Sequence, residues 1–307
     1  MSNYTHIYNI YETMKKRLFM ILCISFAVLC GYAQQKQGHA PTPNKRGIGK
    51  GRVVDHAKIS VWYAMNADNV EDMKTYIDFQ RLDVGDSIVK YYSWFLYCSD
   101  SLRADWEKKN PNSHAAPRWM GEGGKNKDRW CQYQHSDFYI KNGLLTEYAC
   151  MPHALTQYNS YYSEPYPQMM WELVDEHQGV MGYDCQKATC HWRGRDYVAW
   201  FAPSIPVRRG PWKFGGLPGL ILKVYDTQRL YTFEATAIEK GRYPIMRHEY
   251  KAYKKSKRAD VQKHQRAFAE NWYKASEFRK GTILPNGQME LGEYMSVHTN
   301  YEPLELE

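Results

Sequence analysis

Gly210-Pro-Trp-Lys-Phe-Gly-Gly-Leu-Pro-Gly-Leu-Ile-Leu222 is the stretch that decides how the fold is interpreted. It holds four glycines and two prolines, and it lies between two apolar runs, residues 196–203 and 220–225. Glycine reaches backbone conformations that are closed to other residues, and proline fixes φ. We therefore predict a tight bend that joins two β-strands.

Segments typical of β-strands continue outward on both sides of this bend. Most follow one another without an intervening helix, which predicts antiparallel pairing. The 26 tyrosines and 10 tryptophans of the chain favour half-buried pleated surfaces. We predict an α+β protein that is mostly antiparallel β and forms a curved open sheet or half-barrel. Its strands are expected at residues 58–65, 76–82, 87–93, 136–140, 144–148, 169–174, 181–191, 196–202, 220–225 and 230–238.

Two helices are predicted beside the sheet. One short helix lies near residues 94–109, where Leu102 and Trp106 are four positions apart. A basic helix lies near residues 258–278, and we expect it to pack on the concave side or the edge of the sheet. The apolar side chains on one stripe of this helix are Val261, Phe268, Trp272 and Ala275.

The amino-terminal residues have the pattern of an export signal. A basic triplet precedes an apolar run, and small residues end the run at Gly31 and Ala33. We predict a signal peptide over residues 1–33, with Met14 as the natural start and cleavage near Ala33. The run is short for a membrane span, so we expect no transmembrane span after its removal.

Export predicts a soluble protein in the periplasm or outside the cell. Lipid attachment at Cys30 is the alternative, but Leu29 in front of it is bulky where small residues are usual. Residues 34–57 are rich in proline, glycine and basic residues and are interpreted as a flexible leader. Residues 58–307 are long enough to bury the core of one domain.

The chain is basic, but its expected export argues against a nucleic-acid partner. Removal of the signal deletes three basic residues and one acidic residue, so the net charge falls from +8 to +6. The remaining basic residues concentrate at 251–280, where we interpret them as the solvated face of a helix. An exported protein meets little nucleic acid, so we expect no nucleic-acid partner.

Residues around the bend resemble a known family. Gly216-Leu-Pro-Gly-Leu-Ile221 is similar to the hexapeptide that names the GLPGLI family of exported envelope proteins of Bacteroidota, whose function is uncharacterised. Asn300-Tyr-Glu-Pro-Leu-Glu-Leu306 resembles the family's Asn-Pro-Ile-Glu-Leu ending, with Tyr and Glu interposed. The resemblance implies location in the envelope and carries over no activity, substrate or catalytic residue. Further matching segments are Gly182-Tyr-Asp-Cys-Gln-Lys-Ala-Thr189, Arg193-Gly-Arg-Asp-Tyr-Val-Ala-Trp200, Ile205-Pro206 and Gly210-Pro-Trp-Lys-Phe214.

Five cysteines remain after export, and an oxidising compartment permits disulfides. Cys131 and Cys150 flank the same predicted hairpin, which makes them the preferred pair. Cys185 and Cys190 would lie about 17 Å apart on one continuous strand and are not expected to bridge. Histidines near some cysteines lack the spacing of a zinc or copper site, so no metal or cofactor is expected.

The candidate binding residues lie on and before the bend. Two arginines are suited to a carboxylate, a phosphate or a glycan, and two tryptophans to an apolar ligand or a sugar. The alternative is structural, with a tight turn at the arginines, core tryptophans and a bend encoded by glycine and proline. The candidates are Arg193, Arg195, Trp200, Trp212, Lys213, Gly216, Pro218 and Gly219.

Two hypotheses of function follow. The favoured one is a non-catalytic envelope protein that binds an amphipathic small ligand or another envelope protein through an aromatic-rich curved sheet. The alternative is a periplasmic hydrolase or thiol enzyme whose site is assembled only in three dimensions. The sequence contains no local catalytic signature, and it leaves the oligomeric state open.

Overall fold

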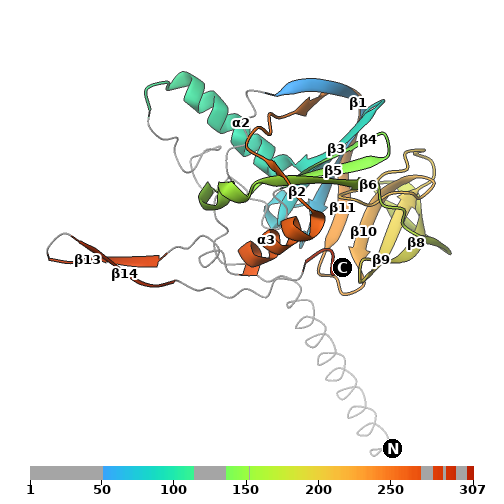
Figure 1. The fold of residues 1–307 in the computed structure, drawn as a ribbon. Helices are drawn as coiled ribbons and strands as arrows, with labels where there is room; N and C mark the ends of the chain where they lie inside the picture. Colours follow the sequence, from blue (N-terminus) through green and yellow to red (C-terminus); the bar gives the residue numbers. More distant parts are fainter. Residues whose placement is uncertain (1–50, 114–135, 152, 271–278, 286–287, 295–302) are drawn as a thin grey trace, which may run out of the picture.

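Two runs of antiparallel strands form the main sheet, and β1 joins them (Figure 1). The computed structural model describes residues 51–113, 136–151, 153–270, 279–285, 288–294 and 303–307. The first run contains β1 (Arg52–Met65), β2 (Asp78–Val84), β3 (Ile88–Ser93), β4 (Ser136–Lys141), β5 (Leu144–Ala149) and β6 (Ser160–Pro165). The second contains β7 (Glu172–Val180), β8 (Tyr183–Trp192), β9 (Arg195–Ala202), β10 (Leu220–Asp226) and β11 (Thr232–Arg247).

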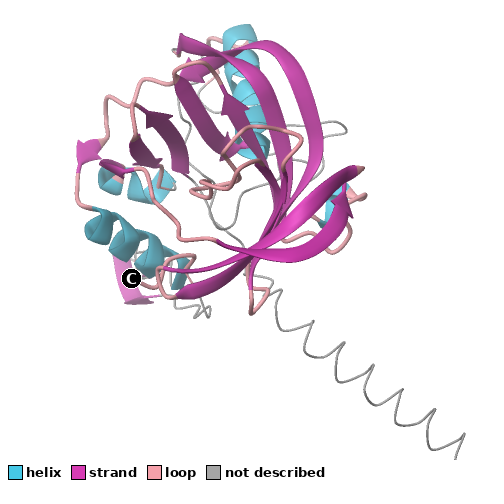
Figure 2. Cartoon of the chain, turned by 90° about the vertical axis from the view of Figure 1, so that its right-hand side faces the viewer, coloured by secondary structure: helices cyan, strands magenta, loops and turns pink. Residues whose placement is uncertain are grey.

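Within each run, strands that follow one another in sequence pair antiparallel. The runs meet where β1 pairs antiparallel with β11, with register shifts that interrupt the ladder. β12 (Lys254–Lys255) adds to β6 in parallel, so the order is β12-β6-β5-β4-β3-β2-β1-β11-β10-β9-β8-β7. Figure 2 shows the strong curvature of the strands. The structure therefore confirms a mostly antiparallel, curved and open sheet.

Both predicted helices are present. α2 (Trp94–Lys109) begins at Ser93, whose side chain accepts a hydrogen bond from the amide of Leu96. α3 (Arg258–Glu270) buries Val261 and Phe268, which pack against residues of β5 and β6 near the sheet edge. The rest of the predicted basic helix lies outside the described residues. Two short 3₁₀ helices are η2 (Met73–Thr75) and η3 (His153–Tyr158).

The main core lies on one face of the sheet. Alternate residues of β1 such as Val61 and Tyr63 are fully buried there, and they pack with β9 and β10 residues such as Phe201 and Leu222. A smaller cluster lies on the opposite face and includes Tyr139 and other residues of β1, β3, β5 and β11. Both faces of the middle strands are therefore covered, which explains why their sequences do not alternate cleanly between apolar and polar.

The strand boundaries differ from the predictions at several places. β7 lies at Glu172–Val180, where a strand was expected at residues 169–174, because it pairs along its length with β8. β1 begins at Arg52, so residues 52–57, assigned above to a flexible leader, belong to the sheet. They are held because β11 continues to Arg247, well past the predicted end at residue 238, and pairs with them. β6 lies in a tyrosine- and proline-rich stretch for which no strand was predicted.

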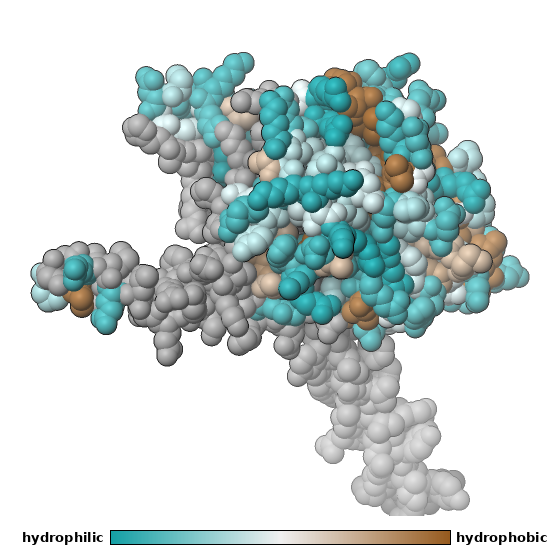
Figure 3. Space-filling model, in the orientation of Figure 1, coloured by the Kyte–Doolittle hydropathy of each residue, from teal (hydrophilic) through white to brown (hydrophobic). Residues whose placement is uncertain are grey.

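A second, two-stranded sheet consists of β13 (Arg279–Ile283) and β14 (Met289–Tyr294). It is not hydrogen-bonded to the 12-stranded sheet, and Figure 1 shows it extending away from the body of the molecule. In the described part of the chain, no helix is both long and apolar enough to cross a membrane. Figure 3 shows a mainly hydrophilic surface on the face in view, with apolar residues in separate patches.

Candidate functional site

The bend at residues 210–219 lies in the loop between β9 and β10. Trp212 and Gly216 have positive φ angles of 51° and 94°. Gly219 has no room for a Cβ, which would collide with the backbone carbonyl of Ala202. The hydroxyl of Tyr166 donates to the carbonyl oxygen of Phe214 at 3.0 Å, and this bond holds the loop against the body. These features show a structural role for the bend and direct Lys213 inward.

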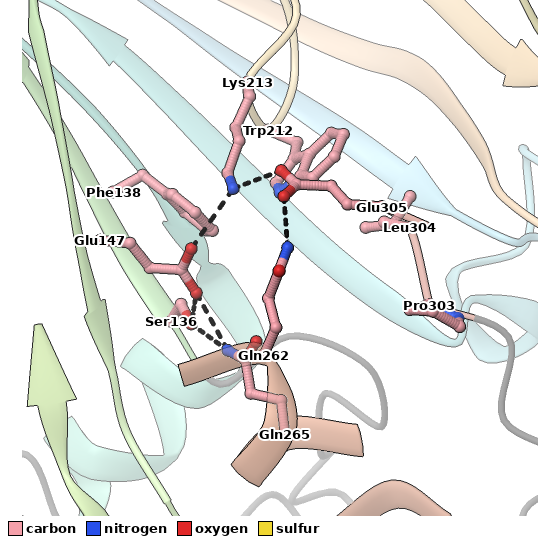
Figure 4. A pocket seen from close by; sticks show the side chains of 10 residues that line it. All are labelled: Ser136, Phe138, Glu147, Trp212, Lys213, Gln262, Gln265, Pro303, Leu304 and Glu305. Atoms are coloured by element: carbon pink, nitrogen blue, oxygen red, sulfur yellow. Dashed lines mark hydrogen bonds and ion pairs between the residues drawn. The ribbon is translucent and has the colours of Figure 1, made fainter. Parts of the chain in front are cut away.

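Lys213 is the centre of a buried ionic network (Figure 4). Its side chain is 2% exposed. The Nζ atom donates to Glu305 at 2.5 Å and to the hydroxyl of Tyr162 at 2.8 Å, and it lies 3.5 Å from Glu147. We call the whole network the ion cluster. It consists of Glu147, Glu164, Arg193, Lys213, Arg258 and Glu305.

Glu305 is the most heavily bonded acid of the ion cluster. Its carboxylate also accepts hydrogen bonds from Arg193 at 2.6 Å, Arg258 at 2.7 Å and Gln262 at 2.5 Å. Burial by itself would raise the pKa of Glu305, but the charges of Lys213 and Arg193 outweigh burial and hold the pKa below its usual value of 4.5. Glu305 is therefore an ionised side chain in the protein interior.

Glu147 is the second deeply buried acid. It lies on the core face of β5 and accepts hydrogen bonds from Ser136 at 2.7 Å, from Tyr162 at 2.7 Å and from Gln265 of α3 at 2.9 Å. Burial and the neighbouring Glu147 charge raise the pKa of Tyr162 well above its usual value, so its hydroxyl stays protonated. The network thus connects the sheet, α3 and the bend.

Residues 303–307 lie across this network. Arg195 donates to the carbonyl oxygen of Pro303 at 2.7 Å and 3.0 Å, and Tyr197 donates to that of Leu304 at 2.8 Å. The amide of Leu306 donates to the carbonyl oxygen of Arg193 at 3.0 Å. The arginines predicted to bind a ligand therefore bind a segment of their own chain.

The space left inside the ion cluster is small. A cavity of about 50 Å³ is lined by Lys213, Glu147, Glu305 and Trp212 among others. This volume is on the scale of one or two waters, far below the roughly 300 Å³ of a typical ligand pocket. The ion cluster in this state has no room for a small-molecule ligand.

The predicted site residues separate into three groups. Arg193 and Lys213 belong to the ion cluster, and Arg195 and Trp212 lie beside it. Trp200 is 8% exposed and packs in the main core, so its ring offers no free face to a ligand. Gly216 and Pro218 are exposed and Gly219 is buried, all on the bend and outside the lining of the cavity.

Sequence reasoning missed the acids of the ion cluster. Glu147 occupies an inward-facing position between Leu145 and Ala149, and a charge in that alternation was a usable signal. Glu305 lies in the ending that carries the family resemblance. Glu164 and Arg258 gave no comparable signal, because they meet only through tertiary packing.

Three of the four described thiols are poorly suited to nucleophilic chemistry, because burial also raises the pKa of Cys98. Burial raises the pKa of Cys185 to about 11 and that of Cys190 to about 12. Both are free thiols on the continuous strand β8, as the strand assignment predicts. The predicted Cys131–Cys150 bond involves a residue outside the described part of the chain and stays a prediction.

A larger opening lies on the opposite face of β4 and β5. We call it the tyrosine groove, and its volume is about 520 Å³. Tyr148 forms one wall, stacked on Tyr250 at a centroid distance of 3.8 Å and edge-on to Tyr139. The lining residues are Arg52, Val53, Val54, Ile88, Tyr139, Lys141, Asn142, Leu144, Thr146, Tyr148 and Arg247.

The tyrosine groove has an unbalanced charge. Three basic residues line it and no acidic residue does, and none of the three forms an ion pair with a described acid. Arg247 is held by a 2.5 Å hydrogen bond to the hydroxyl of Tyr148, which fixes its guanidinium at the wall. Val53 and Leu144 are each 50% exposed and add apolar surface. The tyrosine groove therefore combines positive charge, aromatic rings and aliphatic side chains.

Comparison with known proteins adds a family of unknown function. Residues 193–223 match the model of a family described as a protein of unknown function, Porph_ging. The match covers only this segment and fits the predicted uncharacterised family associated with Bacteroidota, and the GLPGLI name stays a prediction. A search of curated proteins gives no match.

Among solved structures, the chain is similar to PNGF-II in two crystal forms, at 12% identity and TM-scores of 0.44 and 0.43. The alignments cover 70% and 69% of this chain but 34% and 33% of the PNGF-II chain. The chain thus spans about a third of that protein. Likeness of this degree supports no conclusion about function.

Proposed function

We propose that this protein is a non-catalytic binding protein whose tyrosine groove takes an anionic amphipathic small molecule. The observation that carries the proposal is an open groove of about 520 Å³ with three basic residues, a tyrosine wall and no acid in its lining. Ligand pockets typically measure roughly 300–1,000 Å³ and combine apolar walls with a few polar groups. The tyrosine groove meets both criteria.

The arrangement of side chains sets the orientation in which the ligand would bind. Arg247 and Lys141 are suited to the acidic head, since ionised hydrogen bonds are the strongest that a side chain offers. Val53, Leu144 and the ring of Tyr148 are suited to the apolar body. A neutral ligand would gain nothing from the positive charges of the groove.

The enzymatic alternative has less support. A thiol enzyme needs a thiolate, and the raised pKa values of Cys185 and Cys190 keep both thiols protonated at neutral pH. The ion cluster contains acids and bases, but its groups are bonded to one another around a cavity of about 50 Å³. Neither region offers a reactive group beside space for a substrate.

Export to the cell envelope is part of the proposal. It is supported by the signal-like pattern of residues 1–33, and the match to a Bacteroidota-associated family is compatible with it. The ligand would then be a molecule that reaches the periplasm or the cell exterior. Intact-mass measurement of the native protein would test this part, because cleavage near Ala33 predicts a chain that begins at Gln34. A chain that keeps residues 14–33, or carries lipid on Cys30, would contradict it.

The experiment for the tyrosine groove compares two probes with the same tail. Dodecanoate and dodecanol compete with the fluorescent anion anilinonaphthalene sulfonate for the folded protein. We expect dodecanoate to compete at least about tenfold better, which corresponds to about 1.4 kcal/mol. Equal competition by the two probes would show that charge is not recognised.

Variants then locate the binding. Arg247→Met and Lys141→Met should each weaken dodecanoate by about tenfold, the usual scale for loss of one charge-assisted hydrogen bond. Lys251→Met is the matched control, because Lys251 is an exposed lysine outside the groove that pairs with Glu249. Unchanged affinity in both groove variants would refute the proposal.

A further inference from the structure

Residues 303–307 lie in a site that is built entirely by other parts of the chain. The β8–β9 hairpin binds their backbone through the three hydrogen-bonding groups described above. The bend supplies Lys213, and α3 supplies Arg258 and Gln262 to the side chain of Glu305. We call this the acceptor site. It consists of Arg193, Arg195, Tyr197, Lys213, Arg258 and Gln262.

The acceptor site is specific for an acidic residue between two leucines. Leu304 is 8% exposed and belongs to the main core cluster. Glu305 meets three cations. Leu306 lies over Gly194, where an added Cβ would come within 2.8 Å of the leucine Cβ. Replacing Glu305 would leave cations uncompensated and truncating Leu304 would open a void in the core, whereas Leu306 is 45% exposed and adds less.

The hairpin that precedes the bound segment in the sequence, here called the arm, stands apart from the body of the molecule. β13 and β14 pair only with each other in the described structure, and they extend away from the body (Figure 1). An isolated two-stranded hairpin is marginally stable in water and adds little to hold the arm in one place. None of the bonds that hold residues 303–307 depends on which copy of the chain the arm comes from.

We propose that the acceptor site takes residues 303–307 of a second copy of this chain, giving an exchanged dimer in which the partner subunit's Glu305 completes the ion cluster. Exchange of an identical element keeps every contact of the closed monomer and costs no new interface. The exchange is reciprocal, so it closes as a two-fold dimer and does not extend into a chain of copies. This inference is independent of the tyrosine groove.

The first test uses the unaltered protein. Copies grown with natural and with heavy nitrogen are mixed, partly unfolded, returned to native conditions and measured by native mass spectrometry. We expect dimers of intermediate mass that contain one copy of each. Monomers alone across the accessible concentration range would overturn the proposal.

The second test asks whether the dimer uses the acceptor site. One copy carries Glu305→Gln and the other carries Lys213→Met, so each copy alone has a mismatched ion cluster. In the exchanged heterodimer, one acceptor site joins the native lysine with the native glutamate, and the other joins the two neutral substitutes. We expect the mixture to favour the heterodimer at least about tenfold over the statistical ratio, because mismatched buried charges are costly.

A control pair of variants distinguishes the exchanged dimer from a dimer that forms through another surface. Glu307→Gln and Lys251→Met alter exposed charges outside the contacts that carry the proposal, so their mixture should give the statistical ratio. A statistical ratio in the Glu305→Gln and Lys213→Met mixture would mean that the copies associate elsewhere and would overturn the assignment. The mixing of unaltered copies keeps the proposal testable if either variant fails to fold.

Discussion

The two faces of the β4–β5 hairpin lie in different environments: one is closed and the other is open. On one face, Ser136 and Glu147 point into a network that α3 and residues 303–307 close. On the other face, Tyr139, Thr146 and Tyr148 line an open groove. Neighbouring residues of one strand thus enter different environments because side chains alternate across a sheet. Among the described residues, the charges of the ion cluster are bonded to one another within the fold, whereas the basic residues of the tyrosine groove form no ion pair with a described acid and are those that the proposed ligand would meet.

Removal of Glu305 is the largest expected disturbance on the closed face. Glu305→Ala leaves the buried Lys213 and the partly buried Arg193 without their shared partner, although Arg193 keeps Glu164. Breaking a buried ion pair from one side typically costs about 3–5 kcal/mol, so we expect a loss of that size in the free energy of unfolding. Urea denaturation measures it.

The control for this variant is Glu307→Ala, since the side chain of Glu307 is exposed at the same end of the chain. Its loss should stay within about 0.5 kcal/mol, as for most surface substitutions. Similar losses for both variants would show that the segment, and not the buried charge, carries the stability. The buried charge of Glu305 would then not distinguish the closed face from the open face.

Removal of Glu147 should have the next largest effect. Glu147→Ala leaves the hydroxyls of Ser136 and Tyr162 without their acceptor, and the amide of Gln265 keeps only the hydroxyl of Ser136. Unsatisfied buried donors cost about 1–3 kcal/mol each in the limit where nothing rearranges. Lys213 keeps Glu305, so we expect a total near 3 kcal/mol, measured by thermal and urea unfolding. A loss below about 1 kcal/mol would mean that water replaces the carboxylate.

The sequence predicts the strands of the sheet better than it predicts what packs on each of its faces. Alternation in residues 136–148 and the Asn142-Gly143 turn identify the β4–β5 hairpin, because these signals are local. The partners of Lys213 come from β5, β6 and residues 303–307, and no spacing in the sequence connects them. Lys213 was therefore predicted as a ligand contact, although its carboxylate partners are intramolecular.

One strand and the last part of another were not predicted, for a related reason. β6 contains tyrosines and a proline, and its pairing with β5 and with β12 decides its conformation. The last part of β11 contains Gly241 and Pro244, both disfavoured in strands, and it is held by β1. Residues 52–57 have no apolar period of their own. The sequence therefore assigns them, including the groove residue Arg52, to a leader outside the domain.

Acid should weaken the closed face less than removal of Glu305 does. The folded pKa of Glu305 is depressed, so its contribution is fully present above its usual value of 4.5 and is lost as the pH falls through the folded value. The neutral carboxyl still accepts some hydrogen bonds, which limits the loss. We expect the free energy of unfolding to fall below pH 4.5, and to fall less steeply in Glu305→Gln. Identical pH profiles for the two proteins would assign the acid sensitivity to other carboxyls.

Substitution of Thr146 should have the smallest effect and is the sharpest comparison, because Thr146 is the direct neighbour of Glu147 on β5. Its hydroxyl shares one exposed 2.8 Å hydrogen bond with Ser163. Thr146→Val keeps the shape and the β-branching of the side chain, so the free energy of unfolding should change by no more than about 0.5 kcal/mol. If the tyrosine groove binds its ligand as proposed, the same variant should alter dodecanoate affinity while Glu147→Gln leaves it unchanged. A loss of stability in Thr146→Val as large as that in Glu147→Ala would show that both faces of the hairpin contribute equally to folding. The two faces of β5 would then not differ in the way proposed here.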